Sequence, residues 1–104
     1  METLKKNEDF FYIIKNGRWR RLKTFVVYWV PSEEKKFGFA ASKKLRTRVK
    51  KNRVKRRLRE VVRLNLDILP PGKYIFMGSH NTLKARWEEI QEDLKRFVKD
   101  LENS

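Results

Sequence analysis

The chain of 104 residues has no cysteine, one histidine, four glycines and three prolines. Without cysteine there is no disulfide, no thiolate zinc site and no cysteine nucleophile, and a single histidine cannot form an imidazole metal cluster. No apolar run approaches the ~18 residues of a membrane span, and the first ten residues lack the apolar stretch of a signal peptide. We therefore expect a soluble cytoplasmic protein with no membrane partner.

Acidic residues are also scarce, since 13 Asp and Glu accompany 27 Lys and Arg and the formal net charge is +14. The excess is concentrated in residues 43–63, which carry twelve cations and one glutamate. So much like charge in one segment repels itself unless a polyanion neutralises it, which makes nucleic acid the first candidate partner. An anionic membrane is the weaker candidate, because an interfacial helix normally carries Trp, Phe or Leu opposite its basic face and this segment has only Val and Leu there.

The length permits one domain, residues 1–104, and 12% aromatic residues indicate a folded core rather than a disordered basic tail. Helical periodicity and end signals predict three helices, at 7–17, 49–66 and 87–101. Apolar and aromatic runs predict three strands, at 25–30, 37–42 and 73–78, and we expect a further short strand at 18–23.

The predicted fold class is therefore α+β in the order α-β-β-β-α-β-α, with helices packed on a mostly antiparallel four-stranded sheet. Strands 37–42 and 73–78 flank the basic helix as a βαβ crossover, for which a right-handed connection is the general default.

The predicted basic helix has two unlike faces. Four apolar residues form one stripe: Val54, Leu58, Val61 and Val62. The opposite face holds Asn52, Arg56, Arg59 and Arg63, with Arg53 and Lys55 on its flanks. This face can be merely solvated, can enter a DNA major groove or can bind an RNA backbone. The scarcity of acidic partners favours binding, and the lack of helix-turn-helix, zipper or zinc spacing favours RNA.

A second candidate site is aromatic. Phe10 and Ile14 share one face of the first helix, and Val26 and Tyr28 share one face of a strand, so the four side chains can line a cleft that stacks single-stranded bases. Ordinary core residues are the alternative, and in so short a chain this explains most aromatic side chains better. Tyr28 is the best exception, because its hydroxyl prefers a partner or water.

No catalytic constellation emerges from the sequence. The acidic residues of the last helix, Glu88, Glu89, Glu92 and Asp93, have the pattern of a solvated face, and His80 lies in a predicted surface loop. We expect no catalytic residue, no protein-bound metal and no nuclease activity of the chain alone.

At KKNRVKRRLRE, residues 50–60, the sequence resembles the basic signature of the protein subunit of bacterial ribonuclease P. LKKNEDF, FVVY, SKK, PPGKYI and WEEIQEDL stand in the family's order, so the resemblance covers nearly the whole chain. It implies a ribonucleoprotein that removes the 5′ leader of precursor tRNA, in which a catalytic RNA subunit performs Mg²⁺-dependent chemistry and no further protein partner is required. The alternative is a ribosomal or other structural RNA-binding protein.

The resemblance also implies a left-handed βαβ crossover and a role for particular residues. RNA-binding residues would be Lys43, Lys44, Lys51, Asn52, Arg53, Lys55, Arg56, Arg59 and Arg63. The leader cleft would comprise Phe10, Ile14, Val26 and Tyr28. The chain departs from the family pattern at five positions: Ile14, Ala40, Arg46, Arg48 and Lys51. Lys51 keeps a charge but lacks the arginine fork, and the loop with Arg46 and Arg48 must close without glycine.

Overall fold

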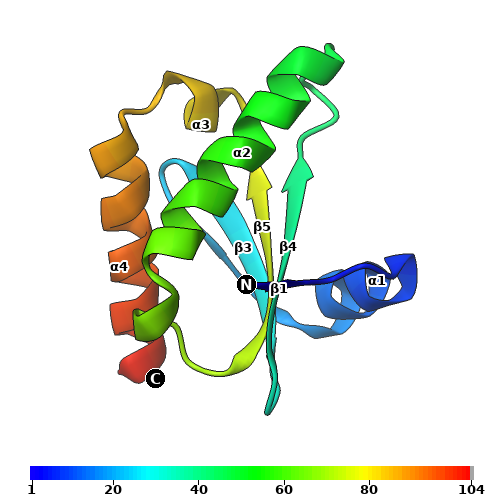
Figure 1. Cartoon of the computed structure of the whole chain (residues 1–104), viewed down its shortest axis with the longest axis vertical. Coiled ribbons are helices and arrows are strands. Elements are labelled where there is room, and N and C mark those ends of the chain that lie inside the picture. The colour runs from blue at the N-terminus through cyan, green and yellow to red at the C-terminus, as the bar shows by residue number, and fades with distance from the viewer. Residues whose placement is uncertain (104) are drawn as a thin grey trace.

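The computed structural model describes residues 1–103 (Figure 1). Its elements are, in order, β1 (Glu2–Thr3), α1 (Asn7–Asn16), β2 (Arg18–Arg21), β3 (Phe25–Pro31), β4 (Lys35–Ala41), α2 (Arg48–Leu64), the 3-10 helix η1 (Leu66–Ile68), β5 (Gly72–Gly78), α3 (His80–Lys84) and α4 (Trp87–Glu102). All seven predicted elements are present, which confirms the α+β class. Across these residues no helix is both long and apolar enough to cross a membrane.

The sheet departs from the prediction in strand number and in direction. Its five strands have the order β1-β4-β5-β3-β2. The β1–β4 and β4–β5 pairs are parallel, and the β5–β3 and β3–β2 pairs are antiparallel. The expectation of four mostly antiparallel strands is thus wrong. The fifth strand, β1, has two residues, which are too few to produce a recognisable alternation.

The crossover from β4 to β5 is left-handed. In Figure 1, β4 points upward, α2 then descends in front of the sheet, and β5 points upward on the left of β4. A right-handed connection would place β5 on the right of β4 in this view, as most βαβ units do. The handedness implied by the family resemblance therefore holds, and the general default fails.

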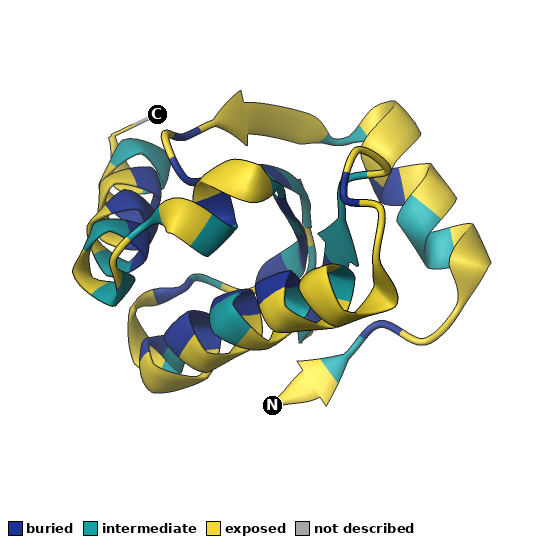
Figure 2. Ribbon diagram, turned by 90° about the horizontal axis from the view of Figure 1, so that it is seen from above, coloured by how far each residue is buried: buried dark blue, intermediate teal, exposed yellow. Residues whose placement is uncertain are grey.

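The two faces of the sheet carry separate apolar clusters. Alternate residues of β3, β4 and β5, among them Val27, Phe37 and Phe76, pack against α2 and α4 in the larger cluster. On the opposite face Ile75 packs with Leu4 and with Ile13 of α1 in the smaller cluster. Figure 2 shows α2 buried on the side toward the sheet and exposed on its outer side.

Local contacts define the helix ends, and the end of α2 differs from the predicted one. Asn7 is the first helical residue of α1, and Lys6 takes the N-cap position without a side-chain cap. Thr47 caps α2 by accepting a hydrogen bond from the Lys50 backbone N–H at 3.2 Å. At the other end the Asn65 side chain donates to the Val61 carbonyl at 2.7 Å, so α2 stops two residues before the predicted end.

Asp93 of α4 is a correction to the predicted solvated face, because this carboxylate is only 3% exposed. Its Oδ2 accepts hydrogen bonds from the Thr24 backbone N–H at 2.8 Å and from the Thr24 hydroxyl at 2.6 Å. The same Thr24 carbonyl accepts from the Thr82 hydroxyl at 2.6 Å. These bonds fasten α4 and α3 to the turn between β2 and β3.

Candidate nucleic-acid interface

The basic residues of α2 share one face because the apolar stripe on the opposite face packs against the sheet. Val54, Leu58, Val61 and Val62 are all buried, as the helical periodicity predicts. The remaining positions point away from the sheet, and those proposed to bind RNA are exposed or half-buried: Lys51, Asn52, Arg53, Lys55, Arg56, Arg59 and Arg63. Lys43 and Lys44 are exposed in the loop that leads from β4 to α2.

Arg63 differs from the other cations of this face because it has an acidic partner. Its guanidinium donates to both carboxylate oxygens of Glu60, at 2.6 and 3.3 Å. The hydrogen bond from Arg63 lowers the pKa of Glu60, and the same bond raises the pKa of Arg63. The charge at this end of α2 is therefore partly neutralised within the protein.

Arg57 serves the fold rather than the surface. Its Nη1 donates to the carbonyls of Thr82 and Leu83 at 2.9 and 2.8 Å, and its Nη2 donates to the Ala85 carbonyl at 2.6 Å. These carbonyls lie in or just after the last turn of α3, where backbone acceptors have no helical partner. Arg57 thus satisfies the end of α3 and holds it against α2.

Arg59 is ordered by an aromatic ring. Its guanidinium carbon lies 5.4 Å from the centre of the Phe39 ring, a cation–π distance. Arg59 itself remains exposed. The ring restricts the side chain on one side while its donors stay available to a ligand.

The aromatic side chains of the predicted cleft lie on the other face of the sheet, around α1. Phe10 and Tyr28 are half-buried and pack against the cluster of Ile13 and Ile75. The Phe10 ring lies directly over Gly38 of β4, where an added Cβ would come within 2.5 Å of the ring. A glycine is therefore required for this close approach.

Ile14 and Val26 lie outside that packed cluster. Ile14 is 41% exposed, and Val26 is half-buried on the same face of β3 as Tyr28. All four predicted cleft residues consequently lie on the α1 side of the sheet, with Phe10 and Tyr28 as the better-packed pair.

Two residues of β2 were missed by the sequence analysis. The register pairs Trp19 with Tyr28 and Arg21 with Val26, and partners across an antiparallel pair share a face. Trp19 is 64% exposed, so it adds an accessible ring beside Tyr28. The alternation in RWRR could have indicated which residues share a face. Which face each residue lies on depends on the register of β2 with β3, which the sequence does not reveal.

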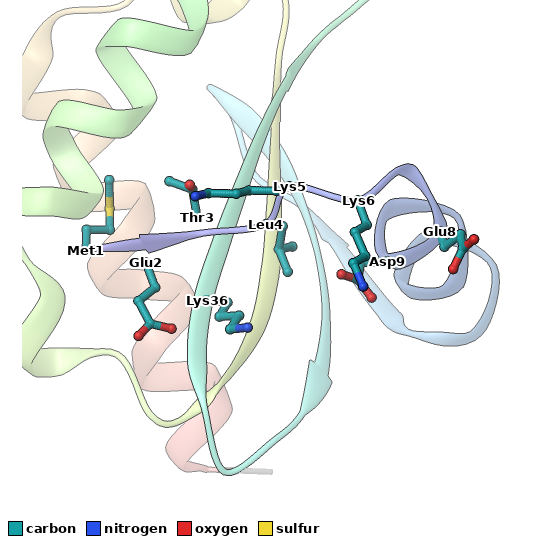
Figure 3. A pocket seen from close by; sticks show the side chains of 9 residues that line it. All are labelled: Met1, Glu2, Thr3, Leu4, Lys5, Lys6, Glu8, Asp9 and Lys36. Carbon is teal, nitrogen blue, oxygen red and sulfur yellow. The ribbon is translucent and has the colours of Figure 1, made fainter.

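A pocket of about 690 Å³ lies between the N-terminal segment and α1 (Figure 3). Three acidic and three basic side chains line it: Glu2, Glu8, Asp9, Lys5, Lys6 and Lys36. Lys36 is also bound by Glu34, whose hydrogen bond at 3.0 Å raises the pKa of Lys36. Because acidic side chains stand among the basic ones, this pocket lacks the concentration of unpaired cations found on α2.

A sequence model of the family described as Ribonuclease P matches residues 1–102. The chain belongs to the ribonuclease P protein family. The Ribonuclease P protein component of Nitratiruptor sp. is 32% identical over 98 residues, which cover 94% of this chain and 90% of that protein.

Two solved structures from Staphylococcus aureus are similar to this one. Its RNase P protein superposes with a TM-score of 0.81 at 27% identity, covering 97% of this chain and 95% of that one. A second structure, described as an RNase P protein mutant with defective mRNA degradation activity, has a TM-score of 0.82 at 27% identity and covers 96% and 87% of the two chains.

The departures from the ribonuclease P family pattern have local structural solutions. The loop with Arg46 and Arg48 closes without any left-handed residue, since no residue among 1–103 has a positive φ. Instead the Ser42 hydroxyl and carbonyl accept hydrogen bonds from the backbone N–H groups of Lys44 and Leu45, at 3.2 and 3.1 Å. Leu45 is fully buried and anchors the loop.

Proposed function

We propose, for this member of the ribonuclease P family, that the basic face of α2 binds the catalytic RNA and that the cleft between α1 and β3 binds the 5′ leader of precursor tRNA. The observation that carries the proposal is the placement of these two surfaces on opposite sides of one sheet. The chain acts as a subunit of the endoribonuclease that matures tRNA 5′ ends, and the RNA subunit cleaves the bond.

The basic face suits recognition of a folded RNA backbone. With 17 residues, α2 is about 25 Å long at ~1.5 Å per residue, enough to approach several phosphates. Arg53, Arg56 and Arg59 have planar forks that match phosphate oxygens. Lys51, where the family signature has arginine, contributes charge without that fork.

The cleft suits a single strand. Bases stack on aromatic faces regardless of their identity, and each stacked base is worth about 1–3 kcal/mol. Tyr28 and the neighbouring Trp19 offer two rings on adjacent strands, and Phe10 of α1 packs on the same side of the sheet. Ile14, aromatic in the family pattern, provides apolar contact but no stacking.

The chain's own contribution to chemistry is electrostatic. Among residues 1–103 no group of three or more His, Asp or Glu side chains is placed to hold a metal ion. Mg²⁺ in this proposal is held by RNA, where it supports cleavage. The cations of α2 neutralise phosphates where the two RNAs approach, which lowers the magnesium concentration needed to bring them together.

Reconstitution tests this function. A bacterial catalytic RNA is assayed for precursor tRNA cleavage at low Mg²⁺ with and without the chain, and the chain is expected to stimulate cleavage. A leader-length series is measured in parallel, and affinity is expected to rise with the leader. Absence of stimulation would refute the proposal.

Two alternatives predict different results in the same assay. A ribosomal or other structural RNA-binding protein would bind its RNA equally well with or without a leader on the tRNA. A self-contained nuclease would cleave in the absence of catalytic RNA. Because one similar structure is described as a mutant with defective mRNA degradation activity, an mRNA substrate belongs in the protein-only arm, where we expect no cleavage.

A further inference from the structure

Strand β2 is an open edge of the sheet. Within residues 1–103 it pairs only with β3, and all four of its residues, Arg18–Arg21, are exposed. The hydrogen bond from the Leu22 N–H to the Phe25 carbonyl at 2.8 Å fixes which backbone groups face β3. Because such bonds recur at alternate residues of an antiparallel pair, the N–H and C=O groups of Trp19 and Arg21 point outward. The outer edge therefore offers two donors and two acceptors to another strand.

A pocket of about 400 Å³ lies beside this edge, between β2 and α4. Its lining includes Trp29 of β3 and Phe97 of α4, whose ring centres are 4.9 Å apart in an edge-to-face contact. Leu101 extends the apolar lining along α4. An ion pair between Arg20 and Asp100, 2.5 Å from Nη1 to Oδ2, joins β2 to α4 at the pocket. A strand added to β2 would direct alternate side chains toward this apolar lining.

The charge of this edge discriminates between possible partners. Three of the four residues of β2 are arginines, and only Arg20 has an acidic side chain within 4.0 Å among residues 1–103. A second copy of this chain pairing edge to edge would bring arginines together, which destabilises a sheet. The same arginines attract an acidic strand, so the edge repels one partner and selects another.

RNA is the other anionic candidate for the edge. Phosphate oxygens only accept hydrogen bonds, so they can satisfy the outward N–H groups of Trp19 and Arg21 but not the two carbonyls. A polypeptide strand satisfies both kinds of group, because its backbone alternates donors and acceptors at the same spacing. The edge and the apolar pocket beside it therefore favour a protein segment.

We propose that β2 and the adjoining pocket dock an extended acidic segment of another protein, which adds to the sheet as a further strand. Its backbone pairs with Trp19 and Arg21. An apolar side chain on its α4 side enters the pocket, and a carboxylate on its other side pairs with the Arg21 guanidinium. Docking there leaves the basic face of α2 open, because α2 packs on β4 and β5 and β3 lies between these strands and β2.

The test uses the full chain and a fluorescent heptapeptide with blocked ends, Glu-Val-Glu-Phe-Glu-Val-Glu. A peptide of the same composition with its glutamates in one block is the matched control. Affinity is measured by fluorescence anisotropy, and amide hydrogen exchange of the chain is measured by NMR with and without peptide. Arg21→Pro and Arg21→Ala both remove the side-chain charge, but only proline removes the outward N–H, at an edge position that tolerates proline.

We expect the alternating peptide to slow exchange of the Trp19 and Arg21 amides and to leave the Arg20 amide, which already bonds to β3, unchanged. Arg21→Pro should bind this peptide about two- to tenfold more weakly than Arg21→Ala, as loss of one backbone hydrogen bond does. Alanine in place of the central Phe of the peptide should weaken binding about tenfold, because the pocket then loses its apolar occupant.

Three results would overturn the proposal: no binding of the alternating peptide, equal binding of the block peptide, or binding without protection of the Trp19 and Arg21 amides. Catalytic RNA is added in a separate arm. If RNA displaces the peptide and itself protects these two amides, the edge belongs to RNA and the assignment to a protein segment is wrong.

Discussion

Arg56 and Arg57 are adjacent in the sequence and carry the same side chain. We predict that substituting Arg56 weakens RNA binding, whereas substituting Arg57 destabilises the fold. Arg56 is exposed and has no acidic partner within residues 1–103. Arg57 donates three hydrogen bonds to the carbonyls of Thr82, Leu83 and Ala85. Alanine at each position removes one positive charge, so any difference between the two variants reports these surroundings.

The expected magnitude for Arg57→Ala comes from its three bonds. A hydrogen bond from a charged group contributes about 1.5–3 kcal/mol, but the three carbonyls regain water once the guanidinium is gone, so the total falls below the sum of three bonds. We expect a loss of about 2–4 kcal/mol in the free energy of unfolding. For a chain of this size this lowers Tm by about 10–20 °C. Arg56→Ala should change stability by less than about 0.5 kcal/mol.

Urea denaturation followed by circular dichroism measures the stability difference, with the slope m checked for constancy. Binding of catalytic RNA as a function of salt concentration measures the contact to phosphate. Arg56→Ala should reduce the logarithmic salt slope by about one, and Arg57→Ala, measured where it is still folded, should leave the slope unchanged. Equal destabilisation by both variants, or an unchanged slope for Arg56→Ala, would refute the division of roles.

Two further predictions concern tyrosines. Tyr28→Ala should weaken binding of leader-bearing precursor by about 1–3 kcal/mol and spare mature tRNA; equal loss for both would place Tyr28 in the core instead. Burial raises the pKa of Tyr74 to about 12 from an ordinary value of 10.0, so the difference between ultraviolet titrations of wild type and Tyr74→Phe should have its midpoint near pH 12. Because the native state keeps a proton that the unfolded state releases above about pH 10, the stability due to this group falls as pH rises from 10 to 12.

The predictable part of the fold is the part with strong periodicity. Strands β3, β4 and β5 and helices α2 and α4 repeat apolar residues often enough to be located from the sequence alone. Strand β1 and helix α3 have two and five residues and escape such a pattern. The directions of the strands were harder to predict from the sequence, because the parallel pairing of β1 with β4 depends on tertiary packing.

The candidate site also has a part that periodicity predicts and a part that depends on contacts between distant residues. A helical wheel locates the basic face of α2, because the apolar stripe defines its opposite side. It cannot separate Arg57 from Arg56, since the partners of Arg57 lie 25 to 28 residues away in α3. Asp93 was misplaced for the same reason, because its partner Thr24 is 69 residues distant. The register of β2 with β3 was needed to place Trp19 and Arg21 on the same face of the sheet as Tyr28 and Val26.

The position of β4 joins the two proposed RNA-binding surfaces. Gly38, in the middle of this strand, lies beneath Phe10 of the cleft. The strand then continues through the loop of residues 42–47, fastened by the Ser42 N–H to the Gly78 carbonyl at 2.8 Å and by buried Leu45, directly into α2. In the proposed role, a leader in the cleft and a catalytic RNA on α2 are therefore held at a fixed separation by a paired strand. This fixed separation would favour the approach of the precursor's cleavage site to the catalytic RNA. A flexible linker between the two surfaces would instead lose entropy when it became ordered.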